Sequence, residues 1–327
     1  MMRRSPFLRA FARIVLVVVA GLGWHVPQAT AEPLPDRPIR LVVGFGAGGP
    51  TDILARALAE QLSGSLGRKV IVENRTGASG NIATQAVATA EADGTTLLIG
   101  ASPFAVNHSL FPDFPVRYGR DLTAVAGLGA TSNVLVVHPS LNVRTLAQFT
   151  QHVKERPGAV SYATVGVGSS SHLAGVAFDL LAGTTMVPVG YRGAGEATRD
   201  LLGGHVQAWF APIQSVLDLV RTGQLVAIAT TGPERGSWLP DVPTMSELGL
   251  AGFDVRLWVG LFAPAKVAAE RISTVEAAVA RAMASEGIKA TLNAQGIAPL
   301  SMSRTEFDEF VRREIASWQV VVAALKK

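Results

Sequence analysis

The 327-residue chain contains no cysteine, is 48% hydrophobic and has a formal net charge of +4. The lack of cysteine excludes disulfides, thiolate metal sites and a cysteine nucleophile. The positive charge comes entirely from Arg3, Arg4, Arg9 and Arg13, so the rest of the chain is neutral and gives no reason to expect nucleic-acid binding. The length predicts one large or two medium domains.

The N-terminal residues have the pattern of a secretory signal peptide. Arginines precede an apolar run from Ile14 to Trp24, and the small residues Ala29, Thr30 and Ala31 come before Glu32. The run is about half the ~20 residues of a spanning helix. We therefore expect residues 1–31 to be cleaved and the protein to reach the periplasm; an uncleaved N-terminal anchor is the alternative.

The next part of the chain alternates short apolar runs with amphipathic stretches. Strands are predicted at 39–45, 69–74 and 95–100, helices at 51–66 and 79–92, and an irregular stretch at 103–120. Nearly continuous apolar strands separated by helices indicate a parallel sheet that is covered on both faces.

The same pattern begins again after residue 132. Strands are predicted at 133–138, 160–166, 186–191, 205–210 and 225–230, with a helix at 145–156 that has Thr145 and Gln148 at capping-box spacing. A strand at 253–262 and helices at 268–285 and 304–325 follow, and Ser303 and Glu306 cap the last helix.

These patterns predict an α/β protein with two domains and a ligand cleft between them. Domain 1 comprises residues 32–135 together with 256–327, and domain 2 comprises 136–255. The strands near Val134 and Val259 are the expected crossings between the domains, and they would form the hinge.

The segment Val43–Asp52 joins the first strand to the first helix and is rich in glycine. Glycines let the backbone approach a ligand closely, and the start of the following helix offers free N–H groups to a negative charge. In parallel sheets, loops of this kind bind ligands. The segment therefore favours an anion.

Gly44, Gly46 and Gly49 also match the spacing of a dinucleotide-binding fingerprint, with Glu73 as its ribose acid. Against this alternative, Pro50 and Asp52 indicate that the helix begins only after the last glycine, and Asp52 would repel a pyrophosphate. An exported protein would also lack access to soluble nicotinamide cofactors. A Walker loop is excluded because no Gly-Lys-Ser/Thr is present.

A second loop, Tyr162–His172, ends in Gly168 and three serines before a predicted helix. Serine hydroxyls and free helix N–H groups form another turn that can accept an anion. Capping by Ser169 or Ser170 is the simpler explanation when this loop is taken alone. Its pairing with the first loop favours a carboxylate held from both sides.

Catalytic and metal sites have weaker support in the sequence. The segment Gly168–His172 is not Gly-x-Ser-x-Gly, so it is not a nucleophile elbow. The other histidines of the mature chain show no metal-ligand spacing. We expect no enzyme activity, no cofactor and no metal.

Several ordered segments resemble the Bug receptors, the substrate-binding receptors of tripartite tricarboxylate transporters. The resemblance extends from Pro38 to the C-terminus and rests on Pro38–Val43, Gly48–Asp52, Val72–Arg75, Gly80–Ile82, Gly168–Gly175, Asp200–Gly204 and Leu239–Thr244. It implies a two-lobed Venus-flytrap fold of the periplasmic binding proteins.

The resemblance also implies which residues contact the ligand. The first-loop contacts are Phe45, Gly46, Ala47, Gly48, Thr51 and Asp52, and the further lining residues are Ser102, Thr131, Asn133, Thr164, Gly166, Ser169, Ser170 and His172. Phe45 and Trp258 are candidate apolar walls, with a core position as the alternative for Trp258.

The expected function is therefore a periplasmic, monomeric receptor that captures a small organic carboxylate for the membrane permease subunits of such a transporter. One alternative is a component that presents its ligand to a sensor kinase of a two-component system. The other is the exported dinucleotide-binding α/β enzyme.

Overall fold

The apolar runs that follow the N-terminal segment form parallel strands. The computed structural model describes residues 34–236 and 238–325, so the predicted signal peptide lies outside the described residues. Strand β1 (Ile39–Val43) lies between β2 (Val70–Asn74) and β3 (Thr96–Ala101) and is parallel to both. The predicted parallel arrangement of these strands is confirmed.

Helices α2 (Pro50–Leu66) and α3 (Asn81–Ala88) connect these strands. The predicted helix at 79–92 is shorter than expected because Ser79, in the short 3-10 turn η1 (Ala78–Gly80), has a left-handed backbone. The prediction of an irregular stretch at 103–120 was wrong for its first part, which is helix α4 (Pro103–Leu110). Proline at the first helical position and the buried Phe104 stabilise this helix.

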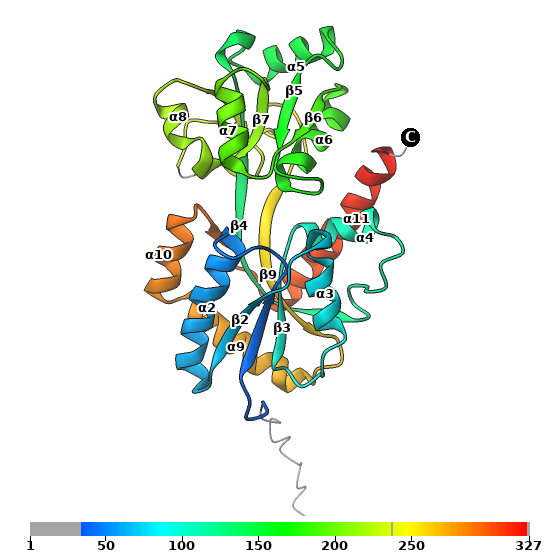
Figure 1. Ribbon diagram of the computed structural model, residues 1–327, viewed down its shortest axis with the longest axis vertical. Helices are drawn as coiled ribbons and strands as arrows, with labels where there is room; N and C mark the ends of the chain where they lie inside the picture. The colour runs from blue at the N-terminus through cyan, green and yellow to red at the C-terminus, as the bar shows by residue number, and fades with distance from the viewer. Residues whose placement is uncertain (1–33, 237, 326–327) are drawn as a thin grey trace, which may run out of the picture. The chain divides into compact units, whose positions relative to one another are not determined.

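Two long antiparallel strands follow in the sheet. Strand β4 (Leu122–Val137) is 16 residues long, and it pairs with β9 (Arg256–Pro264) from Leu122 opposite Pro264 to Ser132 opposite Arg256. The sequence predicted β4 only from Asn133 onward, because the glycines and alanines of its first half have low strand propensity. Figure 1 shows β4 and β9 running between the two sets of strands, as predicted for the crossings.

The strands of the second lobe all assemble on the far end of β4. They are β5 (Ser161–Thr164), β6 (Val187–Gly190), β7 (Ala208–Pro212) and β8 (Val226–Thr230). Strands β7 and β8 pair with β4 in antiparallel fashion, and β5 pairs in parallel with both β6 and β7. Along its main path the sheet has the order β2-β1-β3-β9-β4-β7-β5-β6, and β8 pairs with β4 outside this path.

The pairing directions decide where the loops of the two lobes point. Strands β1, β2 and β3 run in the same direction as β4, because both β3 and β4 are antiparallel to β9. Strands β5, β6 and β7 run opposite to β4. The carboxyl ends of the first set therefore point toward the second lobe, and those of the second set point toward the first.

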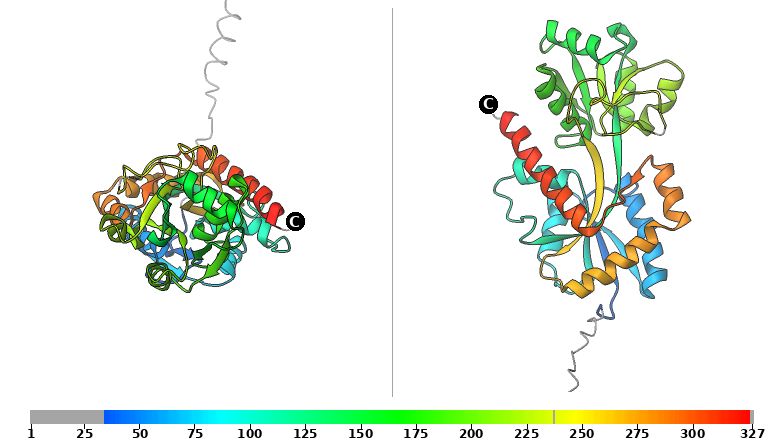
Figure 2. Two further views of the ribbon diagram at one scale, coloured as in Figure 1. Left: turned by 90° about the horizontal axis from the view of Figure 1, so that it is seen from above. Right: turned by 180° about the vertical axis from the view of Figure 1, so that it is seen from behind.

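Helices cover both faces of the sheet in each lobe. In the first lobe α2, α9 (Ala269–Met283) and α10 (Glu286–Ala294) bury leucine, isoleucine and valine against one face. Helices α3, α4 and α11 (Arg304–Leu325) cover the other face (Figures 1 and 2). This packing of C-terminal helices on the first lobe agrees with the sequence-based expectation.

In the second lobe α5 (Leu146–Glu155) and α6 (Ser170–Ala182) pack on one face, while α7 (Ala194–Leu202) and α8 (Leu217–Arg221) lie on the opposite face. Three short elements complete the chain: the 3-10 turns η2 (Pro139–Leu141) and η3 (Ile213–Ser215), and β10 (Ala298–Pro299), which pairs with β4. Within the described residues, no helix is both long and apolar enough to cross a membrane.

Both predicted helix caps are present, and the one at Ser303 and Glu306 is a complete capping box, whereas the Gln148 side chain accepts from the Arg144 N–H over 2.8 Å instead of from Thr145. The Gln148 N–H donates to the Thr145 hydroxyl over 3.2 Å at the start of α5. At the start of α11, the Glu306 N–H donates to the Ser303 hydroxyl, and the Glu306 carboxylate accepts from the Ser303 N–H over 2.8 Å. Each pair satisfies N–H groups that a helix end leaves free.

Trp258 on β9 belongs to the core. Its side chain is fully buried against the rings of Phe262, Phe307 and Phe310. Its indole N–H donates to the Glu314 carboxylate of α11 over 2.9 Å, and burial raises the pKa of Glu314 above its ordinary value. This indole therefore joins a crossing strand to the last helix, rather than forming a wall of a ligand site.

The predicted domain boundaries fall close to the crossing strands. Residue 135 lies inside β4, and residue 256 is the first residue of β9. The assignment of 32–135 with 256–327 to one domain and 136–255 to the other stays a prediction.

Glycine at position 260 of β9 is required by the aromatic packing. A Cβ atom there would lie 2.1 Å from Cζ of the fully buried Phe307. Gly260→Ala should therefore lower the free energy of unfolding by about 1–3 kcal/mol through overpacking. Urea denaturation measures the change.

Gly64 provides the control, because it is exposed within α2 and a Cβ atom there would meet no heavy atom within 4 Å. Gly64→Ala should raise the free energy of unfolding by roughly 0.5–1 kcal/mol. Equal effects of the two substitutions would contradict overpacking at residue 260.

Candidate functional site

The first predicted loop exposes its backbone at the start of α2. Gly46, Ala47 and Gly48 are exposed, Phe45 is partly buried, and Gly48 has a positive φ of 79°. Helix α2 begins at Pro50 after Gly49, whose N-cap position has no side-chain hydrogen bond. The predicted start of the helix after the last glycine is thus confirmed, and the dinucleotide fingerprint lacks the helix start that it needs within the motif.

The Asp52 carboxylate holds this loop together through hydrogen bonds. The carboxylate accepts from the Gly48 N–H over 2.9 Å, from Arg56 Nε over 2.8 Å and from Asn74 Nδ2 over 2.8 Å. These hydrogen bonds, with that from Arg56 the largest, lower the pKa of Asp52 from 3.8 to about 2. The side chain is 2% exposed, so Asp52 positions the loop and its oxygens are already occupied.

Asn74 extends this network to the loop backbone. Its amide donates to the Phe45 carbonyl over 3.0 Å as well as to Asp52, and it comes from the end of β2. The neighbouring residue of the predicted contact set, Thr51, is buried in the first turn of α2. The loop is therefore fixed before any ligand arrives, which lowers the entropy lost on binding.

A second turn, at the start of the predicted helix 79–92, supports the first loop, and its contact with that loop was not predicted from the sequence. Gly77, Ala78, Ser79 and Gly80 all have positive φ, and a Cβ atom on Gly44 would lie 2.8 Å from Cα of Gly80. Left-handed conformations at non-glycine residues are strained and persist where the surroundings impose them. The Gly-Ala-Ser-Gly run was the available signal.

Asn107 of α4 holds this turn. Its amide nitrogen donates to the Ser79 carbonyl and to Asn81 Oδ1, both over 2.9 Å. Asn107 is 3% exposed and lies in the helix that was not predicted from the sequence. Its contribution could not be read from the sequence, because the partners are 26 and 28 residues away.

The serine-rich loop of the second lobe is built in a similar way. Gly166 and Gly168 have positive φ, and Ser169 is the N-cap of α6, with its hydroxyl accepting from the His172 N–H over 3.3 Å. His172 Nδ1 accepts from the Gly168 N–H over 3.3 Å. Burial lowers the pKa of His172, which favours the neutral imidazole that accepts this bond.

The remaining predicted residues lie within β4 or at the carboxyl ends of β3 and β5. Asn133 of β4 donates its amide to the Ser170 hydroxyl over 3.0 Å, which joins the crossing strand to the start of α6. Thr131 is buried within β4, and Thr164 is buried at the end of β5. Ser102 follows β3, and its buried hydroxyl has no hydrogen-bond partner among the described residues.

The structure thus brings the predicted residues together in two groups. Phe45, Gly48 and Asp52 are connected around the β1–α2 loop, and Asn133, Gly166, Ser169, Ser170 and His172 around the β5–α6 loop. Both loops follow strands whose carboxyl ends point toward the other lobe. Within residues 34–236 and 238–325, no side-chain hydrogen bond connects the two groups.

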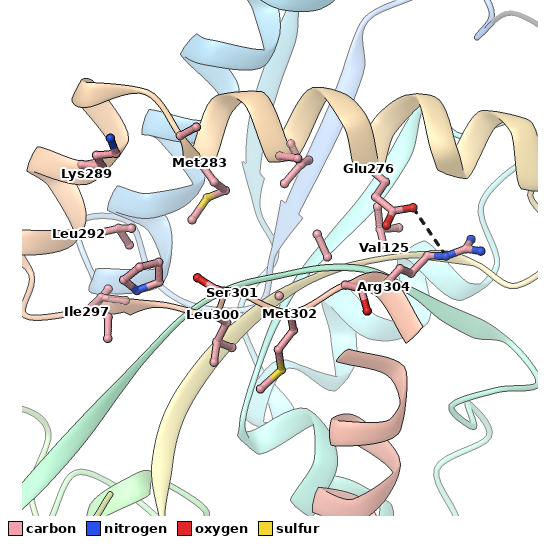
Figure 3. Close-up of a pocket in the computed structure, with 18 of the residues that line it drawn as sticks. Val125, Glu276, Met283, Lys289, Leu292, Ile297, Leu300, Ser301, Met302 and Arg304 are labelled. Carbon is pink, nitrogen blue, oxygen red and sulfur yellow. Dashed lines mark ion pairs between the residues drawn. The ribbon is translucent and has the colours of Figure 1, made fainter. Parts of the chain in front are cut away.

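A large hollow lies elsewhere in the molecule. It has a volume of 830 Å³ and lies between α9, α10 and the start of α11, and Met283, Ile297 and Met302 line it (Figure 3). Its cations are already paired, Arg304 with Glu276 at 3.7 Å and Lys289 with Glu286 at 2.8 Å. None of the predicted contact residues lines this cavity. Neither the start of α2 nor the start of α6 borders it.

A second hollow of 490 Å³ lies beside the crossing strands. Thr131 and Asn133 border it, together with Ile213, Trp238 and Ile297. Asn133 directs its amide to Ser170 at the start of α6, so the polar end of its side chain is committed to the serine-rich loop.

The Asp52 network predicts a specific pH dependence of stability. Because the folded-state pKa of Asp52 lies below its ordinary value, its contribution is present above pH 3.8 and is lost as the pH falls toward 2. Asp52→Asn should lower the free energy of unfolding by about 1–2 kcal/mol at pH 7, a value reduced for the solvent exposure of Arg56. It should also flatten the acid limb of the stability curve.

Urea denaturation at several pH values between 2 and 7 measures both effects. Asp113→Asn is the matched control, because Asp113 is exposed and its side chain forms no hydrogen bond or ion pair among the described residues. An Asp52→Asn variant whose stability depends on pH as steeply as that of the Asp113→Asn variant would contradict the assignment.

Comparisons with known proteins agree with this fold. The family model described as tripartite tricarboxylate transporter family receptor matches residues 54–326. The chain is 37% identical to BugT of Bordetella pertussis over 311 residues, which cover 94% of this chain and 95% of BugT.

Two solved structures extend the likeness to three dimensions. The periplasmic binding protein BugD is 27% identical, with a TM-score of 0.72 and coverage of 89% of this chain and 98% of BugD. MatC from Rhodopseudomonas palustris, solved with bound malate, is 31% identical, with a TM-score of 0.74 and coverage of 88% and 99%. The predicted two-domain α/β fold of the periplasmic binding proteins is confirmed, and the chain belongs to the tripartite tricarboxylate transporter receptor family.

Proposed function

We propose that this protein is a periplasmic solute-binding receptor that holds a small organic carboxylate between the β1–α2 loop and the β5–α6 loop. The observation that carries the proposal is the direction of the strands. The parallel strands of each lobe end toward the other lobe, so the starts of α2 and α6 are presented to the same space. The site residues are those predicted from the sequence, among which Asp52 acts by positioning the β1–α2 loop.

The physical attraction comes from helix ends and backbone N–H groups. Neither loop contains lysine or arginine, and α2 has no side-chain hydrogen bond at its N-cap. The N-terminus of a helix carries a partial positive charge that favours an anion. Asp52 does not cancel this attraction, because Arg56 balances its charge at 2.8 Å.

Ligand capture proceeds by rotation of the two lobes about β4 and β9. A ligand that binds both loops has higher affinity for the closed state and shifts the population toward it. Ser170 contributes in two ways, since it begins α6 and its hydroxyl accepts from Asn133 on the crossing strand. The domain boundaries near residues 135 and 256 are the limits of the two rotating bodies.

The relatives support a carboxylate and a transport role. MatC was solved with malate, and the family model is that of a tripartite tricarboxylate transporter receptor. On this basis the partners are the membrane permease subunits of such a transporter, and the protein is a binding protein rather than an enzyme. Within the described residues no cluster of histidine, aspartate or glutamate could hold a metal ion.

A thermal-shift screen tests the function. The purified protein is screened against dicarboxylates, tricarboxylates, aromatic acids, acidic amino acids and nicotinamide cofactors. A carboxylate at a hundred times its dissociation constant should stabilise the protein by about 2.7 kcal/mol and raise its melting temperature. A shift with nicotinamide cofactors alone would instead support the dinucleotide alternative.

Ser170→Ala tests the site with the same carboxylate. The variant should bind at least several-fold more weakly, because it loses the hydroxyl at the start of α6. Thr145→Ala, which removes a hydroxyl at the start of α5 in the same lobe, is the control for loss of a helix-start hydroxyl away from the site. Equal affinities of both variants and the wild type would contradict the proposed site.

A further inference from the structure

Strand β6 places a third loop next to the serine-rich loop. Strands β5 and β6 are parallel, with Thr164 opposite Gly190, and the Tyr191 N–H donates to the Thr164 carbonyl over 2.8 Å. Residues 191–193 therefore leave the sheet at the same edge as the β5–α6 loop, one strand away. Neighbouring strands are about 4.8 Å apart, so the two loops are neighbours.

The backbone of this third loop is fixed, whereas the side chain of Arg192 is not. The Tyr191 hydroxyl donates to the Asp200 carboxylate over 3.0 Å, and the Arg192 N–H donates to the Glu196 carboxylate over 3.2 Å. Arg192 is exposed and forms no ion pair with any residue in the described part of the chain. The loop therefore has a fixed backbone, and the guanidinium of Arg192 is free to bind a ligand.

In the loops that follow β1–β3 and β5–β8, the other arginines have carboxylate partners. Arg75 after β2 is 2.7 Å from Glu73, and Arg235 after β8 is 2.9 Å from Glu247. Arg56 in α2 is held by Asp52. Among the described arginines of these loops, Arg192 is the one without a carboxylate partner. Its charge is therefore available to a ligand.

We propose that Arg192 is a specificity-determining residue that binds the second anionic group of the ligand, and that the ligand is therefore a dianion. This inference rests on the proposed function, in which the first carboxylate lies between the β1–α2 and β5–α6 loops. Helix ends supply partial charges that suit one carboxylate, whereas a second one at the rim needs a full positive charge. A guanidinium meets this need, because it binds a carboxylate through two parallel N–H donors.

Glu196 does not remove this charge. It lies in the first turn of α7, where its carboxylate accepts from the backbone of residue 192 and compensates the N-terminus of that helix. Because it forms no ion pair with the Arg192 guanidinium, the cation of the loop and the anion of the helix end remain separate.

The experiment compares acids that differ by one charge. Affinities of the purified protein for succinate, glutarate and adipate, and for the monoamide of each, are measured by titration calorimetry. For the chain length that binds best, the wild type should prefer the diacid over its monoamide by at least tenfold. Arg192→Gln should weaken binding of the diacid at least tenfold and leave binding of the monoamide unchanged.

Two further variants distinguish a direct contact from a general loss of positive charge. Arg199 is also exposed, lies on the adjacent helix α7 and forms no ion pair among the described residues, so Arg199→Gln should bind like the wild type. Arg192→Lys should recover part of the preference for the diacid, since it restores the charge without the paired donors. Melting temperatures without ligand verify that each variant is folded.

The outcomes separate this inference from the function on which it rests. A wild type that binds carboxylates with equal affinity for diacid and monoamide, or an Arg192→Gln variant that discriminates as well as the wild type, would overturn the role of Arg192 and leave the receptor function standing. A wild type that binds no organic carboxylate in this series or in the thermal-shift screen would overturn both.

Discussion

The antiparallel pairing of β4 with β9 is the constraint on which the other features of the molecule depend. These strands pair from Leu122 opposite Pro264 to Ser132 opposite Arg256, with register shifts at Ala124–Ala126 and Gly127–Gly129, and they carry the chain between the lobes. Since β3 pairs with β9, and β7 with β4, this one pairing fixes the direction of both sets of parallel strands. It thereby determines that the loops at the carboxyl ends of the two sets face each other, which is the condition for a ligand site formed by both lobes.

Each loop is organised by contacts within its own lobe. The Asp52 carboxylate and the Asn74 amide hold the β1–α2 loop, while Ser169 and His172 hold the β5–α6 loop. Because the side chains satisfy one another, the free backbone N–H groups at the helix starts are the groups left to attract an anion. Arg56 and Arg192 differ in the same respect, because the charge of Arg56 balances Asp52, whereas Arg192 forms no ion pair among the described residues.

Several parts of the fold and site could not be predicted because their cause lies far away in the sequence. The first half of β4 contains glycines and alanines with low strand propensity, and it is a strand because β9 pairs with it along its length. Helix α4 is stabilised by Phe104, whose ring packs against Tyr118 and Phe262. Asn107 on that helix reaches the left-handed turn at Ser79, a contact that no local pattern encodes.

By itself, the sequence determined the elements whose signals are local. The parallel strands were predicted from continuous apolar runs, the start of α2 from Pro50 after a glycine, and the caps of α5 and α11 from Ser/Thr followed three residues later by Gln/Glu. Tertiary structure decided which polar groups are already satisfied. It placed the Asp52 carboxylate in hydrogen bonds with its own loop, Trp258 in the aromatic core, and Arg192 in the loop next to the serine-rich loop. The physical reason is that hydrogen bonding and ion pairing depend on distances between segments, and those distances exist only once the strands have paired.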